Sequence, residues 1–234
     1  MSAAPQRLLL SSGEMPLILT RRDRARRFIL RLDDSGSAVT LTVPRHGSIK
    51  AALQFLEENR HWLERRLADL PPRVPFAHGA TIPLLGAPHV IRHRPDTRGK
   101  GAAWIEGRAL NVAGDGRFLA RRVRDFLKDL ARREAGARAR NMAAAVGRKV
   151  ARISIRDTRS RWASCAHSGD LAFSWRLVLA PHDVLDYVVA HEVAHLRHMN
   201  HGPRFWKQVG ALAPGYENAR LWLRQNRLYL LRFG

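Results

Sequence analysis

The residues best suited to chemistry gather in one short stretch, "HEVAHLRHMNH", which runs from His191 to His201 and holds four of the eleven histidines. His191 and His195 are four residues apart, so on a helix both imidazoles project from one face and can bind one Zn²⁺ ion at about 2.1 Å. Glu192 lies beside that face, where it can take a proton from a zinc-bound water. The stretch therefore predicts a catalytic zinc site with Glu192 as general base.

A catalytic zinc ion needs three protein ligands and one open position. On a straight helix His198 would lie about 10 Å along the axis from His191, too far for both to bind one ion. The third ligand must therefore come from chain that has turned back. The segment "MNHGP" can make that turn, because Gly202 tolerates left-handed backbone and Pro203 can begin a new helix. We expect His201 to be the third ligand, with His198 beside the site or exposed.

Other assignments of these residues stay open. An acidic ligand could take the third position, and Glu217 is the one glutamate downstream of the stretch. The two helical histidines could also be satisfied polar groups at a helix end, with no metal. The spacing of the three histidines is also that of the metzincin peptidases, but His198 occupies the position of their turn glycine and no methionine follows Met199. We therefore do not assign the sequence to that clan.

The pattern of apolar residues predicts which elements hold this site. Residues 181–198 have the spacing of a helix, and the turns before His191 are so apolar that we expect the helix in the core. Residues 170–180 place large apolar side chains at every second position and predict a strand. That strand could lie inside a sheet, or at an edge where it would pair with an extended peptide substrate. Residues 117–146 predict one long amphipathic helix whose arginine face is either solvated or binds anions.

The first half of the chain is predicted to be rich in strands. Residues 27–33 and 38–44 alternate as strands do, and residues 48–70 have helical spacing with Ser48 as the cap. Shorter strands are expected farther on, near residues 80–84, 88–93, 102–106 and 108–113. We find no internal repeat in the sequence.

Length and composition limit the class of protein. The 234 residues suffice for one large domain or two small lobes, and 45 % of them are apolar, enough for a sizeable core. A change in composition near residues 114–116 divides a β-rich N-terminal region with one helix, residues 1–115, from residues 116–234. The expected fold class is α+β.

Charge and cysteine content bear on partners and location. The formal net charge is +21, from 41 lysine and arginine residues against 20 aspartate and glutamate residues. This charge is either a solvated surface or an attraction to polyanions such as nucleic acid, nucleotides or anionic lipid. The single cysteine, Cys165, excludes an internal disulfide and fits a reducing compartment. With no signal peptide and no run of about 18 apolar residues, we expect a cytoplasmic protein without a membrane span.

Three segments together resemble a known family. "RWASC" (161–165), "FSWRLVLAP" (173–181) and "DYVVAHEVAHLRHMNHGPRFW" (186–206) are similar to the YgjP-like metallopeptidases, which are relatives of the SprT-like proteases. The resemblance spans about residues 22–231, with the C-terminal block the more specific part. One departure is Ala163, because the family pattern usually has glycine there.

This resemblance implies a zincin-like catalytic core, in which the active-site helix packs on a small sheet. It also implies zinc ligands at His191, His195 and His201, with Glu192 as general base. Zinc would polarise the scissile carbonyl of a protein or peptide substrate, and Glu192 would pass the proton of the attacking water to the leaving amine. A further donor should stabilise the oxyanion, and the candidates are Arg161, Arg176 and Tyr216.

Two other functions fit the same sequence. A zinc site among arginines could hydrolyse a phosphoanhydride such as that of a nucleoside triphosphate, although the sequence has no P-loop or glycine-rich phosphate cradle. The net charge of +21 also fits a nucleic-acid-associated binding module with a structural zinc, or a protease recruited to nucleic acid. Against a structural zinc, one cysteine cannot supply the thiolate-rich ligand sets that such sites commonly use.

Overall fold

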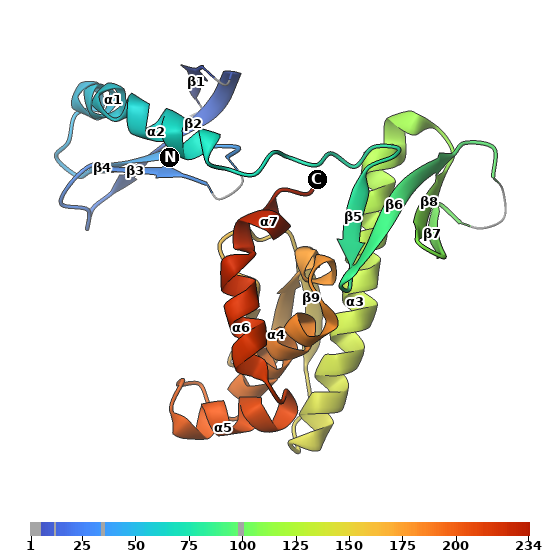
Figure 1. The fold of residues 1–234 in the computed structure, drawn as a ribbon. Helices are drawn as coiled ribbons and strands as arrows, with labels where there is room; N and C mark the ends of the chain where they lie inside the picture. The colour runs from blue at the N-terminus through green and yellow to red at the C-terminus, as the bar shows by residue number, and fades with distance from the viewer. Residues whose placement is uncertain (1–5, 12, 34–35, 98–100) are drawn as a thin grey trace. The chain divides into compact units, whose positions relative to one another are not determined.

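The computed structural model describes residues 6–11, 13–33, 36–97 and 101–234. The chain forms two compact units, Met1–Pro72 and Arg73–Gly234, which we call the N-terminal unit and the C-terminal unit (Figure 1). Among the described helices, none combines the length and the apolar character needed to cross a bilayer.

The N-terminal unit is a four-stranded sheet with two helices against one face (Figure 1). In the order β1-β2-β4-β3, β2 and β4 run parallel and the other two pairs run antiparallel. The strands are β1 (Gln6–Leu10), β2 (Gly13–Arg22), β3 (Ile29–Leu32) and β4 (Val39–Pro44). Every second side chain of the first two strands is buried, as a sheet with one covered face requires: Leu8, Leu10, Met15 and Leu17.

The segment 48–70, predicted as one helix, forms two. Ser48 caps the first as predicted, because its Oγ accepts a hydrogen bond from the amide of Ala51 at 3.0 Å. The prediction of one continuous helix was wrong because the backbone leaves the helical conformation at Asn59, where φ is −103° and ψ is 8°. The two helices are α1 (Ile49–Glu58) and α2 (Arg60–Ala68).

The C-terminal unit begins with a second four-stranded sheet, in the order β5-β6-β8-β7. β6 and β8 run parallel and the outer pairs run antiparallel, as in the first sheet. The two sheets therefore repeat one topology, although the sequence shows no internal repeat. The strands of the second sheet are β5 (Thr81–Leu84), β6 (Ala87–Arg94), β7 (Ala103–Glu106) and β8 (Ala109–Ala113).

This second sheet shares its core with the long helix α3 (Leu119–Ala145), which the sequence predicts over residues 117–146. A short 3₁₀ turn, η1 (Gly116–Phe118), precedes the helix. Buried side chains from both elements form one cluster: Ile82, Ile91, Leu110, Val123 and Leu127. For this reason the compact units divide at Pro72, and not near residue 115, where the composition changes.

The third sheet has three strands in the order β10-β11-β9. Their bounds are β9 (Arg152–Arg156), β10 (Ala163–Cys165) and β11 (Asp170–Ser174). Since β11 pairs with β9 on one side and with β10 on the other, it is an interior strand, and β10 lies at an edge. The prediction of a strand over 170–180 was wrong beyond Ser174. The next five residues form a 3₁₀ helix, η2 (Trp175–Leu179). All five of its side chains are buried, so the alternation of apolar residues in the sequence does not correspond to a buried and an exposed face.

Four helices complete the C-terminal unit, and the first of them, α4, packs against α3, α5, α6 and β10. They are α4 (His182–His195), α5 (Pro203–Leu212), α6 (Tyr216–Gln225) and α7 (Arg227–Leu231). The prediction that the histidine-bearing helix lies in the core is confirmed, since most of its side chains are buried. Arg138 of α3 also ties to α4, because its Nε donates to Oδ1 of Asp186 at 2.5 Å. The fold is thus α+β, with a β-rich N-terminal region and a helix-on-sheet core consistent with a zincin-like domain.

Candidate metal centre

The three histidines meet at the C-terminal end of α4. His191 and His195 lie on its last turns, and His201 returns to them from the segment between α4 and α5. The potential ligand atoms of the three side chains all lie within 4.8 Å of one another. Nε2 of His201 lies 3.1 Å from Nε2 of His191. Tetrahedral ligands at about 2.1 Å from one zinc ion are roughly 3.4 Å apart, so this set fits one metal ion with only small side-chain movements.

The turn that brings His201 back uses a different backbone from the one expected. α4 ends at His195, three residues before the predicted end. Gly202 has φ −80° and so does not use the left-handed conformation. Instead, its amide donates to the carbonyl of Asn200 at 2.8 Å, and Pro203 begins α5 as predicted.

Burial sets the protonation of the ligand atoms. It lowers the pKa of His191 to about 4, with smaller contributions from the neighbouring imidazoles and from Arg220. Burial also lowers the pKa of His195. Both rings are therefore uncharged at neutral pH, which is the form that binds a metal ion.

The imidazole rings of His195 and His191 are held in place in different ways. Nδ1 of His195 donates a hydrogen bond to the carbonyl of His198 at 3.1 Å, which leaves Nε2 as the free ligand atom. His198 thus acts on the cluster through its backbone. Nδ1 of His191 is buried and has no hydrogen-bond partner within the described part of the chain. Its Nε2 is the atom that faces His201.

Aromatic rings support the cluster. The fully buried Phe205 has its ring centroid 4.7–4.9 Å from the centroids of all three imidazoles. Trp206 stacks on His201 at 5.8 Å, and Tyr216 stacks on Trp206 at 5.5 Å. Sequence reasoning missed Phe205 and Trp206. The signal was available, because "HGPRFW" places two rings in the first turn of the helix that directly follows the third histidine.

Glu192 lies beside the imidazoles rather than among them. Its side chain is 7 % exposed, and burial raises its pKa to about 7. It lines a hollow of about 160 Å³ between α4, α6 and the residues at the start of β10. The other lining residues are Trp162, Ala163, Tyr187, Val188, His191 and Leu223. A carboxyl group that can take up a proton near neutral pH therefore faces a space next to His191.

Cys165 lies on β10, close enough to Glu192 for the carboxylate charge to affect the pKa of the thiol. Burial, with a smaller contribution from Glu192, raises the pKa of this thiol to about 11. The thiol is therefore protonated at neutral pH, and it does not belong to the ligand cluster found among the described residues. Glu217, the predicted rival ligand, is also outside that cluster.

The proposed oxyanion donors occupy three different settings. Tyr216 is connected to the imidazoles through aromatic rings, because its ring stacks on Trp206 at 5.5 Å and on Tyr187 at 6.1 Å. Arg161 lines a separate hollow of about 330 Å³. That hollow and the one containing Glu192 share Ala163 as a lining residue.

Arg176 is placed differently from the other candidates. It is 2 % exposed, its guanidinium forms an ion pair with Asp157, and its charge lies 4.2 Å from the centroid of the Trp175 ring. It lines neither the hollow that contains Glu192 nor the one that contains Arg161. These contacts account for Arg176 as a structural cation whose side chain is buried while its partner Asp157 stays exposed.

Arg220 is a cation beside the centre that sequence reasoning missed. Its guanidinium carbon lies 4.8 Å from the centroid of the Trp206 ring, and its charge contributes to lowering the pKa of His191. It stands four residues after Tyr216 on α6, so both side chains share one helix face.

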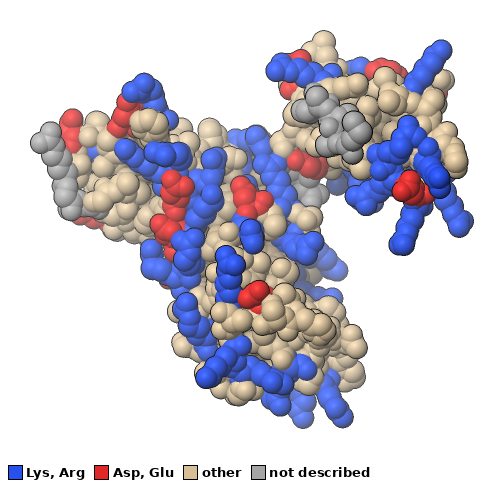
Figure 2. All heavy atoms as spheres, turned by 180° about the vertical axis from the view of Figure 1, so that it is seen from behind, with Lys and Arg blue, Asp and Glu red and all other residues tan. Residues whose placement is uncertain are grey.

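A basic hollow of about 410 Å³ adjoins the centre on the side of His195. Its cationic lining residues are Arg148, Lys149 and Arg197, and His167 lines it too. No carboxylate belongs to its lining, and within the described residues these three cations form no ion pair. On the face drawn in Figure 2, Lys and Arg are spread over the surface rather than gathered in one stripe.

Comparison with known proteins gives one match. A family model described as "YgjP-like, metallopeptidase domain" matches residues 26–226, most of the chain. This match confirms the resemblance seen in the sequence. No curated protein and no solved structure gives a significant match.

Proposed function

The chain belongs to the YgjP-like metallopeptidase family, and from this premise we propose that it is a zinc-dependent peptidase. The ligands are His191, His195 and His201, and Glu192 is the general base. One observation carries the proposal: three imidazoles converge within 4.8 Å beside a buried carboxyl group. We further propose that it works in the cytoplasm, which its single cysteine fits.

Zinc suits this ligand set, because three neutral imidazoles with one open position are typical of catalytic zinc sites. When bound, zinc supplies a Lewis acid that polarises the scissile carbonyl and lowers the pKa of water. Glu192 accepts the proton of the attacking water and passes it to the leaving amine. Burial holds its pKa at about 7, close to the range in which a general base is most effective at neutral pH.

The elements beside the centre suggest how a peptide is held. β10 is an edge strand that contacts α4, so an extended substrate can pair with its free backbone groups. A hollow of about 160 Å³ next to Glu192 then takes one side chain near the scissile bond. Among the proposed donors, Tyr216 stacks on Trp206 beside the imidazoles and Arg161 directly precedes β10 in the chain, and we add Arg220 to these candidates for the oxyanion.

A second candidate function is hydrolysis of a nucleotide phosphoanhydride. It is favoured by the hollow that Arg148, Lys149 and Arg197 line beside His195, because three cations with no carboxylate in the same lining suit a polyphosphate. Acidic side chains of a peptide could occupy the same hollow. Only the products of the reaction distinguish these two uses.

The deciding experiment compares the zinc-loaded protein with its Glu192→Gln variant, using an unfolded protein and a nucleoside triphosphate mixture as substrates. Mass spectrometry identifies all products. New peptides from the unsubstituted protein alone support the peptidase, whereas nucleoside mono- or diphosphates alone support the second candidate. Glu58→Gln is the matched control, since it makes the same chemical change at an exposed glutamate of α1, outside the ligand cluster.

A further inference from the structure

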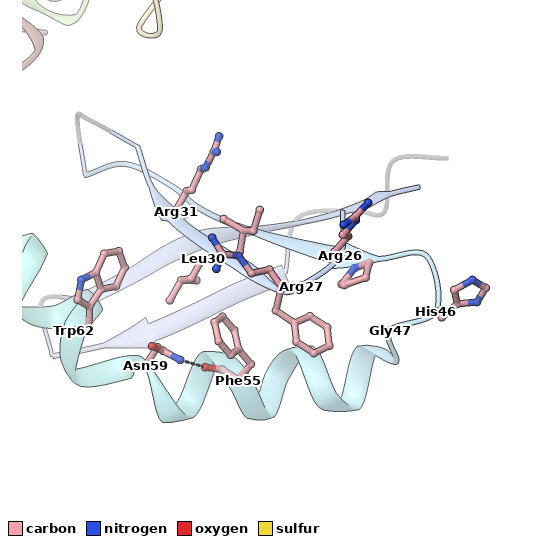
Figure 3. Close-up of a pocket in the computed structure, with 12 residues that line it drawn as sticks. Arg26, Arg27, Leu30, Arg31, His46, Gly47, Phe55, Asn59 and Trp62 are labelled. Atoms are coloured by element: carbon pink, nitrogen blue, oxygen red, sulfur yellow. Dashed lines mark hydrogen bonds between the residues drawn. The ribbon is translucent and has the colours of Figure 1, made fainter. Parts of the chain in front are cut away.

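A second site lies in the N-terminal unit, far along the chain from the histidines. A hollow of about 890 Å³ opens between strand β3, the segment before it, and helices α1 and α2. Figure 3 shows Phe55 and Trp62 extending from the helices toward the strands. The arginines that line the hollow come from the strand side: Arg26, Arg27 and Arg31. Its size is within the range of ligand-binding pockets.

The backbone of β3 offers one half of a binding surface. In the sheet order β1-β2-β4-β3, this strand pairs with β4 on one side, and within the described residues no strand pairs with its other side. The four residues of β3 span about 13 Å at roughly 3.3 Å each. An open strand edge of this length can accept another extended chain through main-chain hydrogen bonds.

The floor of the hollow is apolar. Phe28 and Phe55 pack together with their ring centroids 5.7 Å apart, and both are only partly exposed. Trp62 is 42 % exposed, which is high for the largest apolar side chain. Leu30 of β3 also lines the space. Apolar side chains at alternate positions of a bound strand would cover these surfaces.

The rim of the hollow is positive. Arg26, Arg27 and Arg31 line it together with His46, and no aspartate or glutamate does. Within the described residues, none of the three arginines forms an ion pair. This unbalanced charge selects an anionic partner over a cationic one.

We propose that this groove binds an extended acidic polypeptide segment, which adds to the free edge of β3 as a further strand. Its carboxylates face Arg26, Arg27 and Arg31, and its alternate apolar side chains pack on Phe55 and Trp62. The site is separate from the histidine cluster and needs neither a metal ion nor catalysis. The binding proposal can therefore be tested independently of the proposed peptidase activity.

Nucleic-acid binding and protection of the strand edge are the alternative roles for these residues. A single-stranded nucleic acid would stack its bases on exposed ring faces, but Phe28 and Phe55 pack against each other and leave Trp62 as the largely exposed ring. Charged residues on an edge strand also prevent edge-to-edge association. That protective role by itself predicts no peptide binding.

The test measures binding of short fluorescein-labelled peptides to the full-length, metal-free protein by fluorescence anisotropy. In the main probe glutamate alternates with valine. A second probe replaces glutamate by lysine, and a third carries N-methyl groups on alternate backbone nitrogens, which removes strand pairing. A labelled oligothymidine is the nucleic-acid probe. The variants are the pair Arg27→Glu with Arg31→Glu, and the control Arg66→Glu on the exposed surface of α2, outside the groove.

The proposal expects the glutamate peptide to bind and the lysine and N-methylated peptides to bind at least about tenfold more weakly. The paired charge reversal should weaken binding of the glutamate peptide by about tenfold, while Arg66→Glu leaves it within about twofold. Unchanged thermal unfolding of each variant shows that the fold is kept. The proposal is overturned if the glutamate peptide binds no better than the lysine peptide, or if Arg66→Glu is equally damaging. It is also overturned if oligothymidine binds through Arg27 and Arg31 and displaces the peptide.

Discussion

Replacing His201 by alanine tests the proposed third zinc ligand without disturbing the core. The residue is exposed and lies outside α4 and α5. Its ring contacts are with Phe205, Trp206 and the other imidazoles. We therefore expect the free energy of unfolding of the metal-free protein to fall by less than about 1 kcal/mol. The cluster, however, loses one of its three ligand atoms.

The expected loss of zinc affinity follows from the number of ligands. The free energy of zinc binding to sites in small peptides is about 10–16 kcal/mol at neutral pH. Divided among three protein ligands and one water, a single imidazole accounts for about 2.5–4 kcal/mol, so the His201→Ala variant should bind zinc roughly 60- to 700-fold more weakly. Competition titration against a chromophoric chelator measures this difference directly.

His198→Ala is the matched control, because it removes an imidazole three residues away. The His198 ring is outside the cluster, and the carbonyl that orients His195 belongs to the backbone and remains. Zinc affinity should therefore change by less than about threefold. Equal affinity of His201→Ala and the unsubstituted protein would refute the ligand assignment, and so would an equal loss in both variants.

Three further outcomes follow from the buried groups. Burial raises the pKa of Glu192 from 4.5 to about 7, so ionisation of this carboxyl group lowers the stability of the folded protein as pH rises through that window. Glu192→Gln removes this cost and should stabilise the metal-free protein by about 1–3 kcal/mol near pH 8 and by much less near pH 4. Thermal unfolding at the two pH values measures the difference. The thiol of Cys165, with its pKa raised to about 11, should react with iodoacetamide roughly a hundredfold more slowly near pH 8 than a free cysteine, and rapid labelling would contradict its burial. Arg138→Ala should lower the free energy of unfolding by about 1 kcal/mol, and much of that loss should vanish when Asp186→Asn is already present, since the two side chains interact directly.

The convergence of the three histidines could be predicted because its geometry is mostly local. The i, i+4 spacing of His191 and His195 fixes their common face on any helix. The length of a straight helix then excludes His198 and requires a returning segment, which His201 provides in the structure. Here short-range geometry was enough.

Other features depend on packing between distant segments. Trp175, Leu177 and Leu179 match a strand pattern, yet they lie in a 3₁₀ helix that is buried on all sides. In the sequence Arg176 looks like a free surface cation, but its side chain is buried and forms an ion pair with the exposed Asp157. Arg220 meets the centre only because α6 packs against α4. Such contacts have no spacing rule in the sequence, so local patterns could not reveal them.

The division of the chain shows the same limit. The composition change near residue 115 is real, but it marks the start of α3 rather than the edge of a packed core. Ile82 and Leu110 precede that point and still share a cluster with Val123 and Leu127 of the helix. Core membership depends on which surfaces meet after folding, and composition does not determine it.

The most direct test of the proposed centre is crystallographic. Diffraction data collected on both sides of the zinc absorption edge, from crystals grown with zinc, locate the ion by its anomalous signal. We predict one peak bounded by nitrogen atoms of His191, His195 and His201, each at about 2.1 Å from it. A zinc peak held by other residues, or none between these three imidazoles, would contradict the assignment.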